Sequence, residues 1–149
     1  MEPLNLPHYP VKVKKRSEKH FDIFDVIRRK WFQLTPEEWV RQHWIHHLQT
    51  HYGVPQGLIS CETGHRHGAR SKRTDLLAWK NGKVLLLIEC KAPNISIGEK
   101  TLDQALVYQK EHQAHYLLLT NGKDHFCFQT DLNSGQLSPI SKLPFFDSW

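Results

Sequence analysis

Val84-Leu85-Leu86-Leu87-Ile88-Glu89-Cys90-Lys91 is a run of five aliphatic residues that ends in a carboxylate and an ammonium group. An aliphatic run of this kind, apolar on both faces, favours a central β-strand that is covered on both sides of its sheet. Side chains alternate along a strand, so Glu89 and Lys91 share one face while Cys90 lies on the other. Burying charged groups is costly unless they are paired or given a metal ion or an anionic substrate. The end of this strand is therefore the first candidate for a functional site.

A second carboxylate, Asp75, interrupts an apolar pattern in the preceding β-like segment, residues 73–79. Two carboxylates from neighbouring strands supply the hard oxygen ligands that Mg²⁺ prefers, with Mn²⁺ as a substitute. Lys91 adds a cation near an attacking water and the developing negative charge, which completes the set that metal-assisted phosphodiester hydrolysis needs. An isolated Glu-x-Lys more simply solvates a strand end, with Asp75 capping a turn. The surrounding sequence must decide between the two interpretations.

The two segments are joined by Lys80-Asn81-Gly82-Lys83, which is typical of a β-hairpin. A two-residue turn would pair Lys80 with Lys83 and, without a bulge, put the two carboxylates on opposite faces. A shared metal ion requires Asp75 and Glu89 to point to the same face. This needs an even register, in which the numbers of each pair of opposite residues add up to an even sum. We expect that register to arise from a three-residue loop with its glycine left-handed, which pairs Trp79 with Lys83, or from a β-bulge nearer Asp75.

Other segments predict helices and strands around this hairpin. Thr35 is placed as an N-cap, Pro36 as the first helical residue and Glu38 as the end of a capping box, so a helix is expected from there to about His51. Periodicity favours a second helix at 99–113. Residues 21–27 are expected to form a short strand or an arm that packs on the domain. Strands are expected at 58–62, 116–120 and 125–130, which together with the two strands of the hairpin gives the order α-β-β-β-α-β-β. Residues 1–30 are interpreted as an N-terminal arm and residues 31–149 as one domain.

The composition is that of a folded globular protein with 149 residues, 39% of them hydrophobic and 23% charged. No aliphatic run approaches the roughly 20 residues that span a bilayer, and no signal-peptide pattern is seen, so we expect a cytoplasmic protein without a membrane segment. The three cysteines show no CxxC spacing and indicate neither a disulfide framework nor a cysteine-based zinc module. A formal charge of +5 makes polyanions plausible partners.

Five motifs follow one another along the chain: Thr35-Pro36-Glu37-Glu38-Trp39-Val40-Arg41-Gln42, Arg73-Thr74-Asp75, Glu89-Cys90-Lys91-Ala92-Pro93, Gln104 with Tyr108, and Leu119-Thr120-Asn121-Gly122. Together they resemble the PD-(D/E)XK nuclease superfamily and, within it, the N-terminal nuclease domain of type I restriction enzyme R subunits in its short stand-alone form. The resemblance runs over about residues 24–127 and implies a restriction-endonuclease-like α/β fold, a central mixed sheet flanked by helices. It also implies a Mg²⁺-dependent endonuclease that hydrolyses phosphodiester bonds in nucleic acid, with DNA as the expected substrate.

The same resemblance implies a role for each residue of the strand pair. Asp75 and Glu89 would bind the metal together with the backbone carbonyl of Cys90, and Lys91 would orient or activate the nucleophilic water. Thr74 stands where the motif has a proline, which leaves the carboxylate in place.

Three further residues match the family on the two helices. Gln104 and Tyr108 match a QxxxY element that lies beside the site and contacts the nucleic acid, although an i, i+4 pair is also typical of an ordinary helix surface. Glu38 matches the first-helix glutamate that helps catalysis by holding metal in many relatives, although the capping box explains it equally well. Basic loop residues are expected to contact phosphates, namely Arg70, Lys72 and Arg73.

A different class of function is a non-catalytic nucleic-acid-binding or assembly subunit that keeps the nuclease fold and holds phosphates through residues such as Lys14 and Lys15. Two desolvated carboxylates argue against it, because without metal their repulsion costs stability and repels phosphate. No Walker sequence is present, so ATP-driven translocation is not expected of this chain alone, and a separate motor or specificity subunit is a compatible partner. Cleavage of a duplex needs two such sites, as in a homodimer.

Histidines offer a competing metal site, because His43, His47 and His51 recur at i, i+4 on one helix, followed by His65 and His67. The helix lacks the glutamate of HExxH, which argues against a metalloprotease, while a structural zinc site remains an alternative. The preferred interpretation is that these histidines lie on a solvated or DNA-facing side of the helix.

Overall fold

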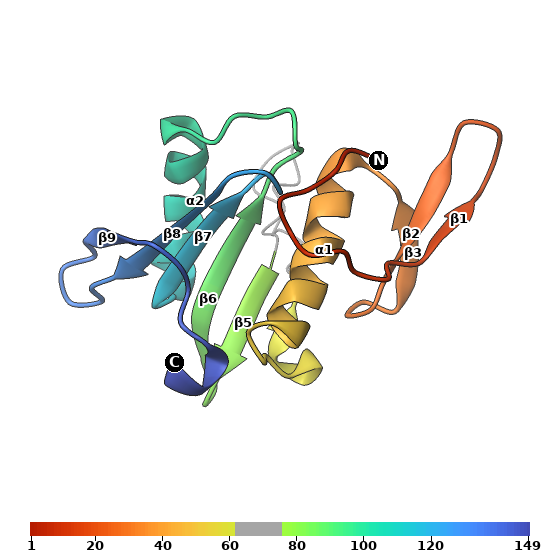
Figure 1. Cartoon of the computed structure of the whole chain (residues 1–149). Helices are drawn as coiled ribbons and strands as arrows, with labels where there is room; N and C mark the ends of the chain where they lie inside the picture. Colours follow the sequence, from red (N-terminus) through yellow and green to blue (C-terminus); the bar gives the residue numbers. More distant parts are fainter. Residues whose placement is uncertain (62–75) are drawn as a thin grey trace.

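The computed structural model describes residues 1–61 and 76–149, in which helix α1 lies between a small and a large sheet (Figure 1). The small sheet is antiparallel, in the order β1 (Val13–Lys15), β2 (Phe21–Asp25), β3 (Lys30–Gln33). The large sheet is mixed, in the order β4 (Ile59–Ser60), β5 (Leu76–Lys80), β6 (Lys83–Cys90), β7 (Tyr116–Thr120), β8 (His125–Thr130), β9 (Leu137–Ile140). The helical elements are α1 (Pro36–Thr50), η1 (Gln56–Leu58), α2 (Glu99–His112) and η2 (Phe146–Ser148).

The predicted α/β fold is confirmed, and the order α1-β4-β5-β6-α2-β7-β8 matches the expected order. The Thr35 hydroxyl accepts a hydrogen bond from the Glu38 N–H at 3.0 Å, as an N-cap should. Sequence patterns did not predict β1, β3 or β9. These strands are short and mostly exposed, and β9 contains a proline, so none of them shows the apolar alternation on which a strand prediction rests.

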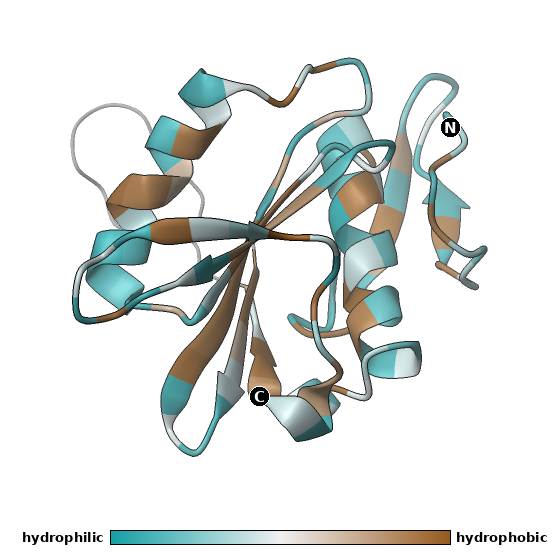
Figure 2. Cartoon of the chain, turned by 60° about the vertical axis from the view of Figure 1, so that its left-hand side comes forward, coloured by the Kyte–Doolittle hydropathy of each residue, from teal (hydrophilic) through white to brown (hydrophobic). Residues whose placement is uncertain are grey.

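Strand β6 is the central strand that its aliphatic run predicts, paired antiparallel with β5 and parallel with β7. Seven of its eight residues are buried, because a helix covers each face of the sheet. Leu86, Ile88 and Cys90 pack in the core cluster that contains α1, whereas Leu87 packs in the cluster that contains Ala105 of α2. Figure 2 shows hydrophobic residues concentrated along the strands of the large sheet. Alternate residues of β6 therefore face different helices.

The β5–β6 hairpin has the expected even register but not the expected loop. Lys80 pairs with Lys83 across a two-residue turn, and Asn81 and Gly82 both have positive φ, as a type I′ turn requires. The predicted three-residue loop, with Trp79 paired to Lys83, is therefore wrong. A bulge between Ala78 and Trp79 shifts the register so that the remaining pairs run up to Leu76 with Ile88. The alternative prediction, an even register made by a bulge, is confirmed for these residues.

The histidine face of α1 is not the solvated surface that we expected. His43 and His47 are buried, and the N-terminal segment covers them. The Tyr9 hydroxyl lies 2.6 Å from Nδ1 of His47, and the Tyr9 ring is stacked on His46. His51 stacks on His47 from the next turn of the helix. The interpretation of a DNA-facing or solvated side is therefore wrong for His43 and His47, because these rings belong to an aromatic core beneath the first residues of the chain.

No helix in the described parts of the chain is long and apolar enough to cross a membrane.

Changing the hairpin turn tests the bulged register. Gly82→Ala should lower the free energy of unfolding by about 1–2 kcal/mol, because Gly82 has a φ of +74° and a Cβ is strained in that region. No atom lies within 4 Å of the added Cβ, so the loss measures backbone strain alone. Gly57→Ala is the matched control, since its Cβ also meets open space without a positive φ. Equal losses in urea unfolding for both variants would contradict the turn geometry.

Buried histidines should make the stability pH-dependent. Burial, followed by the charges of His51 and His125, lowers the pKa of His47 to about 4 from its ordinary value of 6.5. The folded state therefore resists protonation of this ring, so its contribution is complete above about pH 6.5 and is lost as pH falls towards 4. Between pH 6.5 and 5 the loss amounts to about 2 kcal/mol. Urea unfolding of His47→Gln should show a correspondingly shallower pH dependence than the unchanged protein, and parallel curves would refute this assignment.

Candidate functional site

Glu89 and Lys91 meet at the end of β6. The Glu89 side chain is almost fully buried, and its Oε1 lies 3.2 Å from Nζ of Lys91. Lys91 follows the strand, and its backbone N–H donates to the Thr120 carbonyl at 2.8 Å, so pairing with β7 fixes the backbone under the lysine. The Lys91 side chain is 23% exposed, against 6% for Glu89. The buried carboxylate is thus paired with an ammonium that a substrate can still reach.

Helix α2 brings Gln104 to the same place. Its Oε1 accepts a hydrogen bond from Nζ of Lys91 at 3.0 Å. Ala105, the next residue, is fully buried against the sheet and holds this turn of the helix close to the strand. Tyr108 lies one turn further along and is half-buried against the same core cluster. The structure therefore brings Glu89, Lys91 and Gln104 together, with Tyr108 on the adjoining turn of α2.

The alternation of side chains along β6 explains why α2, and not α1, contributes a residue to the site. Cys90 points into the core beneath α1, so its neighbours Glu89 and Lys91 point to the side of α2. The bond from Lys91 to Gln104 agrees with this assignment. Glu38, by contrast, comes from α1, which covers the opposite face of the sheet.

The Thr120-Asn121-Gly122 motif follows β7 and holds the loop after Lys91 in place. The Thr120 hydroxyl accepts hydrogen bonds from the Trp44 indole N–H at 3.0 Å and from the Gly122 N–H at 2.9 Å. The Asn121 amide donates to the carbonyl of Ile95 at 2.8 Å and so anchors the loop after Lys91. Gly122 has a φ of +84°, a conformation in which a residue with a Cβ is strained, and a Cβ there would also press against the Leu4 side chain at 2.7 Å. This motif fixes the backbone around the site and leaves the chemistry to other residues.

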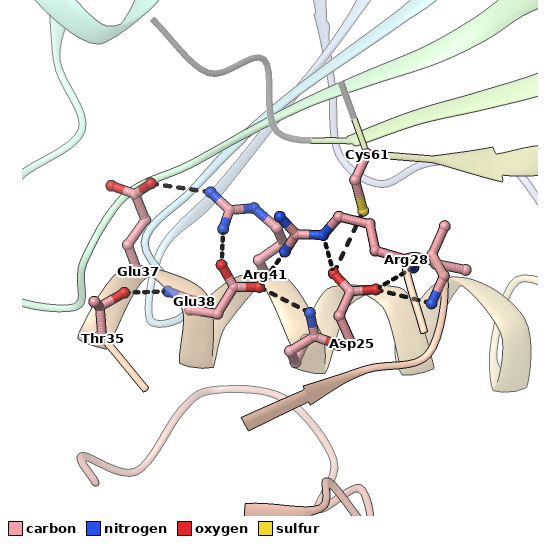
Figure 3. A network of polar contacts seen from close by, with 9 residues as sticks. Asp25, Arg28, Thr35, Glu37, Glu38, Arg41 and Cys61 are labelled. Carbon is pink, nitrogen blue, oxygen red and sulfur yellow. Dashed lines mark hydrogen bonds and ion pairs between the residues drawn. The ribbon is translucent and has the colours of Figure 1, made fainter. Parts of the chain in front are cut away.

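Glu38 belongs to a buried polar network between α1 and the N-terminal sheet (Figure 3). Its carboxylate accepts hydrogen bonds from Nη2 of Arg28 at 2.8 Å, from Nε2 of Gln42 at 2.8 Å, and from Nη1 of Arg41. Only half of the expected capping box forms, because the Glu38 side chain is used for these contacts. Three donors on two oxygens leave little room for a metal ion, so the described contacts favour a structural role for Glu38.

Asp25 extends the network into β2. It accepts from Nε of Arg28 at 2.6 Å and from the backbone N–H groups of Ile27 and Arg28, each at 2.8 Å. Burial alone would raise the pKa of Asp25, but the hydrogen bonds and charge of Arg28 outweigh it and lower the pKa. Sequence analysis missed Asp25 and Arg28. The available signal was alternation in β2, since Asp25 is two residues after the buried Ile23 and so faces inwards.

The described residues supply part of a metal site. Glu89 offers carboxylate oxygens, which suit Mg²⁺ or Mn²⁺. Burial raises the pKa of Cys61 to about 12 and of Cys127 to about 11, so these thiols are poor candidates for thiolate ligands. Among residues 1–61 and 76–149, no three His, Cys, Asp or Glu side chains are grouped to hold a metal ion. Other predicted residues lie outside these ranges: Asp75, Thr74, Arg70, Lys72, Arg73, His65 and His67.

Comparisons with known proteins agree with the fold. The chain is similar to the fragment structure of a putative HsdR subunit of a type I restriction enzyme from Vibrio vulnificus YJ016, with a TM-score of 0.51 and 21% sequence identity. The similarity covers 76% of this chain and 24% of that chain, and it confirms a restriction-endonuclease-like fold. No curated protein matches the chain.

A family model gives the more specific result. The model described as type I restriction enzyme R protein N terminus (HSDR_N) matches residues 36–144. The match begins at the first residue of α1 and includes all six strands of the large sheet. It confirms the resemblance that the five sequence motifs predict. The chain therefore belongs to the family of type I restriction enzyme R protein N termini.

Proposed function

We propose that this chain is a metal-dependent endonuclease that hydrolyses phosphodiester bonds in DNA. The observation that carries the proposal is the contact set of Lys91, whose Nζ lies within 3.2 Å of Glu89 Oε1 and 3.0 Å of Gln104 Oε1 at the buried end of the central strand. Two acceptors hold the ammonium in place while leaving part of it exposed. A positioned, partly exposed lysine beside a buried carboxylate suits electrostatic stabilisation of a phosphoryl transition state.

Asp75 is proposed as the second carboxylate of the site. The register of the hairpin supports this assignment, because Leu77 pairs with Leu87 and Leu76 pairs with Ile88. The next pair in the same register would be Asp75 with Glu89, on the side of α2. Mg²⁺ held by Asp75, Glu89 and the carbonyl of Cys90 would supply a Lewis acid for the phosphoryl oxygens.

The remaining residues have roles in binding and positioning. Lys91 orients the attacking water and balances negative charge, and Gln104 holds the Lys91 ammonium. Tyr108 extends the α2 side of the site towards the nucleic acid, and the basic residues Arg70, Lys72 and Arg73 contact its phosphates. Cleavage of both strands of a duplex would require two copies of the chain, and a separate motor or specificity subunit would be its partner in a larger enzyme.

Removing the lysine tests the chemistry. Lys91→Ala should reduce Mg²⁺-dependent cleavage of plasmid DNA by about 100-fold or more, because a preorganised charge at the transition state is worth that much. Its melting temperature should fall, because the buried Glu89 carboxylate loses its charged partner, so cleavage is compared at a temperature at which circular dichroism shows both variants to be folded. Lys83→Ala is the matched control, because Lys83 lies on the same strand at the exposed end. If Lys91→Ala cleaves as fast as the control, the active site is elsewhere, and if the unchanged protein binds DNA without cleaving it in Mg²⁺ or Mn²⁺, the non-catalytic function replaces this proposal.

Thermal unfolding tests the metal ligands and the role of Glu38. Mn²⁺ should raise the melting temperature of the unchanged protein, because a ligand that binds only the folded state stabilises it. Asp75→Asn and Glu89→Gln should remove that increase. Glu38→Gln should instead lower the melting temperature without metal, since Arg28 and Arg41 each lose one of their two charged partners, and should keep the increase with Mn²⁺.

The opposite pattern would reverse the assignment. If Glu38→Gln abolishes the response to Mn²⁺ while Asp75→Asn retains it, Glu38 is a metal ligand and Asp75 is not.

A further inference from the structure

The N-terminal sheet contains all of the net charge of the protein. Residues 12–33 include eight Lys or Arg and three Asp or Glu, a formal charge of +5 that equals the charge of the whole chain. The rest of the chain is formally neutral. The segment also lies entirely before residue 36, where the family match begins. The basic surface therefore lies outside the part of the chain that the family model matches.

The sheet has one face turned towards α1 and one turned to solvent. Ile23 and Asp25 are fully buried on the inner face. Register places Phe24 opposite Trp31 on the outer face, because strand neighbours alternate between faces. Trp31 is 40% exposed and meets the Phe24 ring edge-on at 5.3 Å between centroids. Figure 1 shows this sheet on the side of α1 that faces away from β6.

Lysines lie directly over these two rings. Nζ of Lys14 is 4.3 Å from the Trp31 ring centroid, and Nζ of Lys12 is 5.8 Å from that of Phe24. Both lysines are otherwise exposed. The outer face thus presents ammonium groups and an accessible indole side by side, in the combination that contacts the phosphate and the base of a nucleotide together.

The acidic residues of the segment do not cancel this charge at the surface. Asp25 is buried and paired with Arg28. Asp22 is buried and lies 3.6 Å from Arg16, which leaves Glu18 as the exposed acid among residues 12–33. Because the two acid–arginine pairs are neutral, the net charge of +5 is carried by exposed side chains, namely Lys12, Lys14, Lys15, Lys19, Arg29 and Lys30 against Glu18.

We propose that the outer face of the N-terminal sheet binds single-stranded nucleic acid, with Lys12 and Lys14 at the phosphates and a base stacked on Trp31. Charge complementarity selects a polyanion, and the exposed indole selects unpaired bases over a duplex, in which the base faces are covered. The inference goes beyond the proposed cleavage and does not depend on it, because α1 separates this face from Glu89 and binding needs no metal.

Binding of a fluorescent 20-nucleotide oligo(dT) to the full chain, measured by anisotropy in EDTA, tests the proposal. Trp31→Ala should weaken binding by about 5- to 100-fold without changing its salt dependence, because stacking is not ionic. Lys14→Ala should weaken binding and reduce the slope of log affinity against log salt by about 0.7. Trp31→Phe should restore most of the affinity, which separates loss of stacking from misfolding. Phe126→Ala and Lys142→Ala are matched controls, since both residues are exposed outside the N-terminal sheet.

Three outcomes would overturn the inference. In the first, Trp31→Ala and Lys14→Ala bind oligo(dT) like the controls. In the second, Lys14→Ala weakens binding but Trp31→Ala does not, and duplex DNA binds as tightly as oligo(dT), which would indicate a non-specific electrostatic surface. In the third, the protein binds phosphatidylserine vesicles and not oligo(dT), which would identify a membrane surface. Plasmid cleavage by Trp31→Ala distinguishes the two proposals, because cleavage that needs Lys91 would persist while the N-terminal surface loses its role.

Discussion

The cost of burying charge is the constraint on which this structure depends. A carboxylate at the end of a strand that is covered on both faces needs a partner, and Lys91 provides it for Glu89 at 3.2 Å. The lysine in turn is held by a glutamine from α2 and by backbone pairing with β7. The same cost explains the second buried polar group, in which Arg28 and Arg41 neutralise Asp25 and Glu38 between α1 and the small sheet. Each polar cluster therefore fixes how one helix packs on one sheet.

Strand parity connects this constraint with the chemistry. The two-residue turn at Asn81 and Gly82 pairs Lys80 with Lys83, which by itself gives an odd register. Two carboxylates on one side of the sheet, as the proposed site has them, need an even register. A single bulge satisfies both requirements. Ala78 pairs with Leu86 and Trp79 pairs with Val84, so Leu85 is the extra residue on β6. The hairpin keeps its favourable turn, and the register beyond the bulge is the even one that the proposed metal site requires. A local irregularity in the backbone thus determines which side chains can cooperate.

Sequence patterns predicted the core because its signals are strong and local. The N-cap at Thr35, the aliphatic run of β6 and the helix from Glu99 each depend on residues close together in the chain. The even register of the hairpin was predicted by requiring that Asp75 and Glu89 share a face, as the proposed metal site needs. The bulge that creates this register could not be predicted, because Ala78 and Trp79 show no distinguishing residue type. The burial of His43 and His47 was also missed. Tyr9, which covers them, is more than thirty residues away, and helical spacing cannot reveal such a partner.

The backbone bond from Lys91 to Thr120 has a consequence for the order of folding. The β5–β6 hairpin joins neighbouring segments and closes a short loop, whereas the parallel pairing of β6 with β7 must wait until α2 has crossed over the sheet. Loop closure of this kind is slow, and contacts between distant residues form late. The segment around Asn5, whose N–H donates to the carbonyl of Gly122, joins residues still further apart. A partly folded or nascent chain would therefore contain the strand with Glu89 and still lack the contacts of Lys91 with β7 and α2, so that the candidate site is assembled only as folding is completed.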